Sequence, residues 1–300
     1  MRNQALATQM GVTDLRPDRA LTGVALVVAA TFLFGLSDTV SKHLATLYAV
    51  PLILAVRYLV NLVLLVAVMS PRHGVRLWQA NRLGLMVVRG MCLAAASLSM
   101  VFALRVMPVG ETVAIIYIAP FLVLLLAGPL LGEKVGLIAW IAAGVSFLGL
   151  LVIVRPGSGL DPCGVVLCLV NAGFATAYHL LTRVLTRSET TMAMLFYTAQ
   201  VGTVVFGAMM PWALGGAIPG WWDAGLLVGL GALATVGHLL FTAAYRLAPA
   251  SVLAPVNYLH IVWAGLLGWL VFAHVPDALA IVGMAMIMLS GVAVAVKAGR

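Results

Sequence analysis

Charged residues are scarce in this sequence, and their scarcity excludes a water-soluble fold. Only 9% of the residues are Asp, Glu, Lys or Arg, whereas soluble domains carry about a quarter. The chain is 63% hydrophobic and its mean hydropathy is +1.13. A water-soluble fold of 300 residues has too little interior to bury that much apolar surface. We therefore expect lipid to surround most of the chain.

Motifs of enzymes and pumps are also missing. None of the three lysines follows a glycine, which excludes a phosphate-binding P-loop, and neither His-Glu-x-x-His nor Gly-x-Ser-x-Gly occurs. The three cysteines lie in apolar stretches without metal-ligand spacing. We therefore expect no enzyme activity, no catalytic residue, no metal and no cofactor, and we see no sign of an obligate protein partner.

The sequence contains ten long apolar stretches. Each approaches the roughly 20 residues that a helix needs to cross a bilayer, and the first is too long for a cleaved signal peptide. They lie at about residues 20–41, 50–69, 83–103, 109–129, 135–154, 162–185, 191–211, 222–245, 251–271 and 278–296. The connections are too short to hold a soluble catalytic domain. The sequence predicts an all-α membrane protein with ten transmembrane helices.

Basic residues are distributed unevenly between the two sides that this topology defines. With the N-terminus in the cytoplasm, twelve Lys and Arg residues flank the spans on the cytoplasmic side and three on the other side. Such a bias is typical of cytoplasmic loops, and it explains the net charge of +8 without any binding of nucleic acid. We predict a multi-pass protein of a bacterial-type inner membrane with both termini in the cytoplasm.

An internal repeat recurs at a constant offset of 141 residues. The pairs that match in one ungapped register include Gly23 with Gly164, Gly90 with Gly231, Arg105 with Arg246, Pro108 with Pro249, and Tyr117 with Tyr258. Each copy holds five spans, an odd number, so the second copy enters the membrane upside down. Inverted repeats are typical of transporters that bind substrate between the repeats. A pseudosymmetric channel, receptor or membrane enzyme is the alternative.

These observations divide the chain into three parts around a central cavity. We predict a cytoplasmic tail at residues 1–19, a first repeat at 20–155 with helices 1 to 5, and a second repeat at 162–297 with helices 6 to 10.

Several local features match a known family. They are the short basic N-terminal tail, Pro51 with Arg57 in the second span, the run from Ala103 to Pro108 and the run from Leu131 to Lys134. From Leu21 to Val296 the chain resembles the drug/metabolite transporter superfamily, in particular its ten-helix members with two EamA-type repeats, and most of all the YddG-type amino-acid exporters. The resemblance implies export of neutral and aromatic amino acids. The chain departs from the family at His274, where an acid is common.

Polar and aromatic residues near mid-span are the candidates for the substrate cavity. We expect Pro120 to interrupt the fourth span and Pro255 the ninth, because proline lacks an N–H group and frees a carbonyl. In lipid such carbonyls need a partner, which a cavity or a substrate can supply. The candidates are Tyr117, Tyr258, Asn257, His260, Trp263, Asn171, His238, Phe102 and Phe241. Hydrogen bonds that only join helices are the alternative for the polar members, and packing for the aromatic ones.

Four ionisable residues are candidates for gating or ion coupling. Asp38 aligns with His179 and Lys42 aligns with Arg183 at the repeat offset. The alternative is pairing between residues four apart, with side chains that reach the membrane surface.

Three further charged residues have a structural interpretation. We expect Arg57 and Arg89 to reach the membrane surface from inside their spans, and Glu111 to be solvated at the end of its span.

The predicted function is a secondary transporter that exports small metabolites, with neutral or aromatic amino acids as the favoured substrates. Its partners are the small-molecule substrate and the lipid bilayer. Alternatives are an exporter of other metabolites or of cationic drugs, and a membrane enzyme or sensor. A buried acid would suit a cationic drug, and the sequence has no Asp or Glu at a midplane position. Without such an acid we favour facilitated export with weak or no ion coupling. Proton coupling is the alternative, and the residues that could support it are Asp38, His179, His238 and His260.

Overall fold

The computed structural model describes residues 17–73, 80–131, 137–155, 157–186, 188–213, 216–244, 247–248 and 250–298, and within them it contains no β-strand. The predicted tail at residues 1–19 lies outside this part except for its last three residues, and residues 132–134 of the family-like run also lie outside it. The helices of the first half are α2 (Pro17–Leu47), α3 (Val50–His73), α4 (Leu83–Val106), α5 (Val109–Ile116), α6 (Ala119–Leu131) and α7 (Leu137–Val154). Those of the second half are α8 (Pro162–Leu185), α9 (Thr191–Ala208), the short 3-10 helix η2 (Met210–Trp212), α10 (Trp221–Ala244), α11 (Ala250–Asn257), α12 (Leu259–Phe272) and α13 (Ala278–Ala298).

The helices make ten membrane crossings. Six of them, α2, α3, α4, α8, α9 and α10, are each long and apolar enough to cross a bilayer. The shorter helices α7 and α13 add one crossing each, and the pairs α5–α6 and α11–α12 each form one interrupted crossing. The predicted ten-helix architecture is confirmed.

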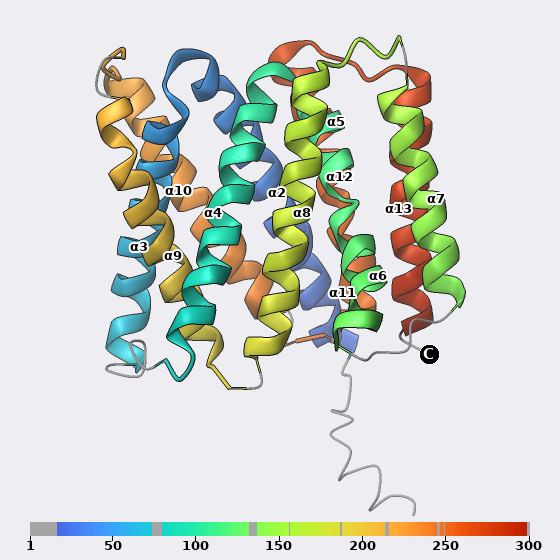
Figure 1. The fold of residues 1–300 in the computed structure, drawn as a ribbon, viewed down its shortest axis with the longest axis horizontal. Coiled ribbons are helices and arrows are strands. Elements are labelled where there is room, and N and C mark those ends of the chain that lie inside the picture. Colours follow the sequence, from blue (N-terminus) through green and yellow to red (C-terminus); the bar gives the residue numbers. More distant parts are fainter. Residues whose placement is uncertain are drawn as a thin grey trace, which may run out of the picture.

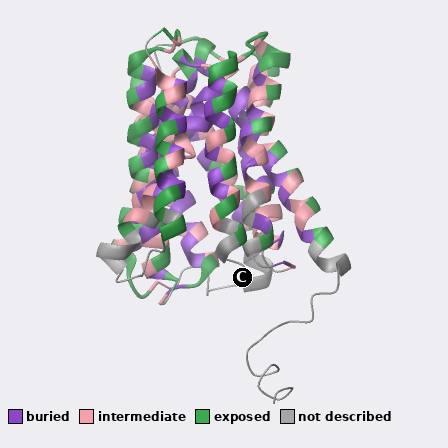
Figure 2. Ribbon diagram, turned by 90° about the vertical axis from the view of Figure 1, so that its right-hand side faces the viewer, coloured by how far each residue is buried: buried purple, intermediate pink, exposed green. Residues whose placement is uncertain are grey.

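The two halves are inverted relative to each other. In Figure 1, α2 rises from the side on which the chain ends, whereas α8 descends from the opposite side. The main helix contacts join one half to the other: α4 packs on α8, α2 on α10, α3 on α9 and α7 on α13. Figure 2 shows buried residues between the helices and exposed residues on their outward faces. Many of those exposed residues are apolar, such as Val63, Phe147 and Leu270, as expected for faces in contact with lipid.

Two glycine contacts reproduce the repeat in three dimensions. A Cβ atom added to Gly90 in α4 would lie 2.8 Å from Cβ of Val201 in α9, and one added to Gly231 in α10 would lie 2.6 Å from Cβ of Val60 in α3. Gly90 matches Gly231 and Val60 matches Val201 at the offset of 141 residues. The same helix crossing is therefore built twice, and each copy needs a glycine because the helices approach too closely for a side chain.

Both predicted interruptions are present, and both occur at the matched tyrosines. In the first half, α5 ends at Ile116 and α6 begins at Ala119. Pro120 has no N–H for the carbonyl of Ile116, and the N–H of Ile118 donates to the carbonyl of Ile115 at 3.1 Å.

In the second half, Tyr258 alone separates α11 from α12. The N–H of Ile261 donates to the carbonyl of Tyr258 at 3.1 Å instead of the carbonyl of Asn257, four residues back, which an unbroken helix would use. The interruption therefore leaves the carbonyl of Asn257 available to another donor.

Candidate functional site

A cavity of about 290 Å³ lies among α3, α4, α8, α9 and α10. Its polar lining includes Arg57, Asn61, Tyr178, His179, Thr198 and His238, and its apolar lining includes Leu65, Leu93, Leu195 and Leu239. The lining residues of α3 and α4 lie near the middle of these helices, whereas His179 and His238 lie late in α8 and α10, which run toward the side on which the chain ends (Figure 1). The cavity therefore extends from the middle of the bundle toward that side.

Arg57 gives the cavity a positive charge. It is the only Lys, Arg, Asp or Glu among the described lining residues. Within the part of the chain that the structure describes, its guanidinium has no hydrogen bond or ion pair. This arrangement contradicts the expectation that Arg57 reaches the membrane surface. An arginine that faces a cavity without a carboxylate partner is suited to bind an anionic group.

Arg89 lies behind the wall of the cavity and is 3% exposed. Its guanidinium donates to the hydroxyls of Tyr178 at 2.6 Å and Thr198 at 2.5 Å, and both of these residues line the cavity. It also donates to the hydroxyl of Thr182 at 2.7 Å and the carbonyl of Met194 at 3.0 Å. The expectation that Arg89 reaches the membrane surface is wrong, because acceptors on α8 and α9 satisfy it inside the bundle.

The predicted cavity residues fall into separate groups. His238 lines the cavity. Asn171 is buried beside α4, where its amide donates to the carbonyl of Ala96 at 2.6 Å. Phe102 packs against the core around α3. Phe241 packs near α2 and α11, and its ring centroid lies 6.2 Å from that of Phe34.

Trp263 packs elsewhere, with its ring centroid 5.3 Å from that of Phe32 in an edge-on arrangement. The remaining four candidates, Tyr117, Asn257, Tyr258 and His260, gather at the two helix interruptions. The rings of Tyr117 and Tyr258 lie with their centroids 5.3 Å apart, so the two interruptions are side by side.

A chain of hydrogen bonds joins these interruptions to α2. Oδ2 of Asp38 lies 2.9 Å from Nε2 of His260, and the other ring nitrogen of this histidine lies 3.2 Å from the hydroxyl of Tyr117. The same hydroxyl is 3.0 Å from the carbonyl of Asn257 and donates to it. We call this set of four residues the polar chain. It satisfies the carbonyl that the interruption at Tyr258 releases.

The four gate candidates occupy different places. Asp38 belongs to the polar chain, and His179 lines the cavity. Arg183 is exposed near the end of α8. Lys42 is half-buried at the opposite end of the bundle, where its ammonium group donates to the carbonyls of Leu104 at 2.8 Å and Met107 at 2.6 Å. Lys42 therefore does not pair with Asp38 four residues earlier.

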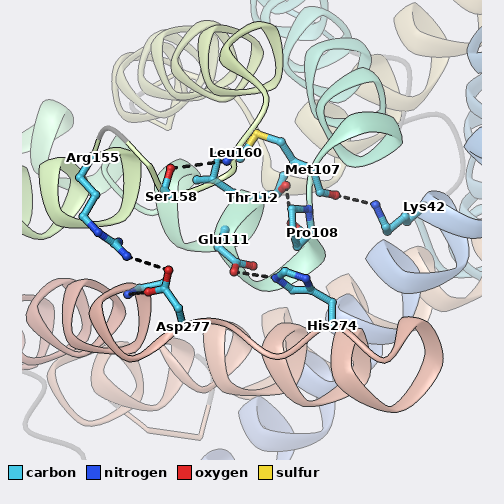
Figure 3. A network of polar contacts seen from close by, with 11 residues as sticks. Lys42, Met107, Pro108, Glu111, Thr112, Arg155, Ser158, Leu160, His274 and Asp277 are labelled. Carbon is cyan, nitrogen blue, oxygen red and sulfur yellow. Dashed lines mark hydrogen bonds and ion pairs between the residues drawn. The ribbon is translucent and has the colours of Figure 1, made fainter.

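Figure 3 shows the end of the bundle that holds Lys42. Glu111 and His274 face each other there, with Oε1 and Nε2 2.9 Å apart, and Arg155 pairs with Asp277 at 2.7 Å. Glu111 is 3% exposed, so the expectation that it is solvated is wrong. No local pattern predicts this contact, because 163 residues separate the partners in the sequence. These pairs join the two halves at this end.

One of these groups lies outside the membrane-spanning segments. The pKa of Asp277 is lowered by the N–H group of Ala280 and by the guanidinium of Arg155, both of which favour the ionised carboxylate. The carboxylate accepts the Ala280 N–H at 2.8 Å, so it also caps the start of α13.

Comparison with known proteins agrees with this architecture. The model of the EamA-like transporter family matches residues 21–155 and again 162–296. A crystal structure superposes with a TM-score of 0.64 at 18% identity, covering 95% of this chain and 99% of that chain, which shows the fold.

Curated relatives are similar over most of their length. The pseudopaline exporter of Pseudomonas aeruginosa is 27% identical over 92% of this chain and 96% of its own. The riboflavin transporter of Brucella anthropi is 28% identical, covering 84% and 90%. The S-adenosylmethionine uptake transporter of Rickettsia prowazekii is 25% identical, covering 89% and 90%. None of these three is named as an amino-acid exporter, and all are transporters of small molecules. The chain belongs to the EamA-like transporter family, and it is a membrane transporter of small metabolites, not an enzyme.

Proposed function

We propose that this transporter exports small metabolites that combine a carboxylate with an apolar body, and that neutral amino acids with apolar or aromatic side chains are among them. The observation that carries the proposal is the cavity around Arg57. Its volume of about 290 Å³ is near the lower end of the roughly 300–1,000 Å³ of small-molecule sites, which favours a small substrate.

The lining is complementary to such a molecule. The guanidinium of Arg57 can bind a carboxylate through two parallel hydrogen bonds. Leu93 and Leu195 offer apolar surface, and Asn61 offers an acceptor for an ammonium group. The predicted binding role of His238 remains part of this proposal. For Tyr117, Asn171 and Trp263, the contacts favour joining helices over lining this cavity.

Charge disfavours the alternative of a cationic drug. Two like charges about 4 Å apart repel by about 4 kcal/mol at an effective dielectric constant of 20. A cation in the cavity would meet Arg57 without a described carboxylate to balance it. An anionic group gains the same interaction with the opposite sign.

The direction of transport depends on the side of the membrane from which substrate reaches the cavity. The cavity extends from the middle of the bundle toward the side on which the chain ends, and the paired residues of Figure 3 join the halves at the other end. With both termini in the cytoplasm, as the basic residues favour, this conformation loads substrate from the cytoplasm. Export then requires the two halves to exchange roles, which inverted repeats permit.

Reporter fusions test the orientation. A reporter after Arg300 should read cytoplasmic, and one inserted near Pro219, between η2 and α10, should read periplasmic. The opposite reading at either place contradicts the proposed direction.

Counterflow in proteoliposomes tests the substrate. We expect exchange of labelled phenylalanine and tryptophan in preference to lysine or a cationic dye. Arg57→Gln should lower phenylalanine exchange by about tenfold or more, the worth of a hydrogen bond to a charged group, while Arg57→Lys retains part of it. Arg105→Gln is the matched control, because Arg105 is exposed at the end of α4. Preference for lysine or the dye, or an unaffected Arg57→Gln variant, overturns the proposal.

A further inference from the structure

The polar chain stands apart from the substrate cavity. Asp38 and His260 are absent from the described cavity lining, and Phe34 lies between the two sites. The ring centroid of Phe34 is 5.0 Å from that of His238, which faces the cavity, and 6.0 Å from that of His260. The substrate proposal therefore leaves a buried carboxylate–imidazole pair without a role.

Burial makes this pair sensitive to the number of protons it holds. The side chain of Asp38 is 8% exposed and that of His260 is 12% exposed. With one proton shared between them the pair is neutral overall, whether the proton resides on nitrogen or oxygen. Loss or gain of a proton leaves a net charge inside the bundle, which costs several kcal/mol. Ionisable groups at such positions in membranes are usually functional.

The polar chain is also connected to both helix interruptions. It links α2 to the end of α5 through Tyr117 and to the end of α11 through the carbonyl of Asn257. Both are interruption points, where regular helix hydrogen bonding stops. A rearrangement of either interruption changes the surroundings of His260.

The other charged groups near Asp38 are bound to other partners or lie on the cavity side of Phe34. On α2, Lys42 is bound to the carbonyls between α4 and α5. Arg57 on α3 and His238 on α10 face the cavity. The titratable residues of α4 are Arg89, bound to α8 and α9, the half-buried Cys92 and the exposed Arg105. On α5, Glu111 faces His274 at the end of the bundle, and α11 has no titratable residue.

We propose that Asp38 and His260 form the binding site of a coupling proton, so that transport is driven by a proton gradient. The inference rests on the proposed transport function. In the conformation seen here one proton lies between Oδ2 of Asp38 and Nε2 of His260. When the interruptions rearrange and water separates the pair, Nε2 releases that proton to water, leaving a neutral imidazole and a carboxylate.

Proteoliposomes with labelled phenylalanine test the proposal in two assays. The first measures counterflow at equal pH on both sides, and the second measures accumulation driven by a pH gradient with the membrane potential clamped. For one proton per substrate, a gradient of one pH unit should give up to about tenfold accumulation in the wild type. Asp38→Asn should keep counterflow within about threefold and lose accumulation. His260→Gln, which keeps an amide in place of the ring, should also lose accumulation.

Asp161→Asn is the matched control. Asp161 caps α8 by accepting the N–H of Gly164, and asparagine caps a helix equally well, so this variant should retain both activities. If the wild type exchanges phenylalanine but ignores the gradient, or Asp38→Asn still accumulates it, the proton site is refuted while the transport function stands. If Asp38→Asn loses counterflow together with accumulation, the pair is structural and the proposal also fails.

If the wild type exchanges no phenylalanine, the proposed substrate is contradicted and the transport assays cannot test the proton site. Infrared spectroscopy then tests the proton site directly. Difference spectra between two pH values, recorded on the full chain in lipid, should contain a carboxyl band that is missing in Asp38→Asn and shifted in His260→Gln. Identical spectra for the wild type and Asp38→Asn refute the proton site without reference to any substrate.

Discussion

Tyr117 and Tyr258 occupy matched positions in the two halves, yet their side chains do different things. The hydroxyl of Tyr117 turns toward the partner half, where it donates to the carbonyl of Asn257 and meets His260. The ring of Tyr258 is 8% exposed and turns within its own half, where its hydroxyl end covers Gly291 of α13. The residue that matches Gly291 in the first half is Leu150.

The repeat therefore sets where the backbone of each half lies, while matched side chains can take different roles. Both tyrosines mark an interruption between two short helices. A glycine beneath Tyr258 gives its ring a place inside the second half, whereas the matched leucine occupies the corresponding position in the first half. Only Tyr117 is therefore placed to complete the polar chain. Asp38 and His179 diverge in the same way, since one pairs with His260 and the other faces the cavity.

Filling the space over Gly291 should cause the greatest loss of stability among the substitutions that test this comparison. A methyl group in Gly291→Ala would collide with the ring of Tyr258, and overpacking of this kind destabilises by about 1–3 kcal/mol. Because the added atom would overlap the ring itself, we expect a loss in the upper part of this range, above the roughly 1 kcal/mol that alanine gains in helix propensity. Thermal unfolding in detergent measures the loss. Gly173→Ala in α8 is the control, because a Cβ there meets nothing within 4 Å, and it should stabilise. Equal stability of the two variants contradicts the proposed packing.

Symmetry can be tested at the repeated helix crossing. Gly90→Ala and Gly231→Ala should each destabilise by about 1–2 kcal/mol, because both close approaches involve a matched valine. The losses of unfolding free energy in the two single variants should agree within about 0.5 kcal/mol. Val201→Ala should rescue the first variant and Val60→Ala the second. Unequal losses would show that the two halves pack differently even where their residues match.

The hydroxyl groups provide a finer test. Tyr117→Phe removes the donor to Asn257 and should destabilise by about 0.5–1.5 kcal/mol, since the freed carbonyl then lacks this partner. Tyr258→Phe should lower the free energy of unfolding by less, because the ring still fills the space over Gly291. Unfolding of both variants under identical conditions measures the difference. The comparison fails if Tyr258→Phe is the more harmful change.

The smallest expected effect concerns the start of α13. Asp277 caps this helix, and the matched position in the first half is Gly136. Because the Ala280 N–H and Arg155 lower the pKa of Asp277, its contribution to stability is present above the ordinary value of about 3.9. That contribution is lost as the pH falls through the lowered pKa of the folded state. Asp277→Asn should flatten the pH dependence of unfolding in this acidic range, and an unchanged dependence would contradict the assignment.

Much of the fold could be predicted from the sequence because its signals are local or periodic. Apolar stretches of sufficient length located the crossings, and the residue matches at a fixed offset revealed the inversion. Proline beside the tyrosines located both interruptions, although Pro120 follows its tyrosine by three residues and Pro255 precedes its own by three. The interruptions themselves coincide with the matched tyrosines.

The candidate site was less accessible to sequence analysis. The sequence indicated that Asp38, His179, His238 and His260 were the notable ionisable residues. The partner that spacing suggested for Asp38 was Lys42, whereas the structure pairs Asp38 with His260. The expected surroundings of Arg89 and Glu111 were wrong. Arg89 is bound by residues of α8 and α9, and Glu111 by His274 in the connection between α12 and α13, all at least 89 residues away in the sequence. Arg57, the charged residue of the cavity, was interpreted as a membrane anchor because its position inside a span fits both roles.

The lipid environment, the ten crossings, the inverted repeat and the two interruptions can all be inferred from the sequence alone. Each of these follows from the order of residue types along the chain. The tertiary structure decided which polar residues face the cavity, which join the polar chain and which close the end of the bundle. Hydropathy along the chain sets the length of a helix and where it crosses the membrane, whereas the rotation of the helix and its partners depend on close packing between helices. The 222 residues between Asp38 and His260 are bridged only by that packing.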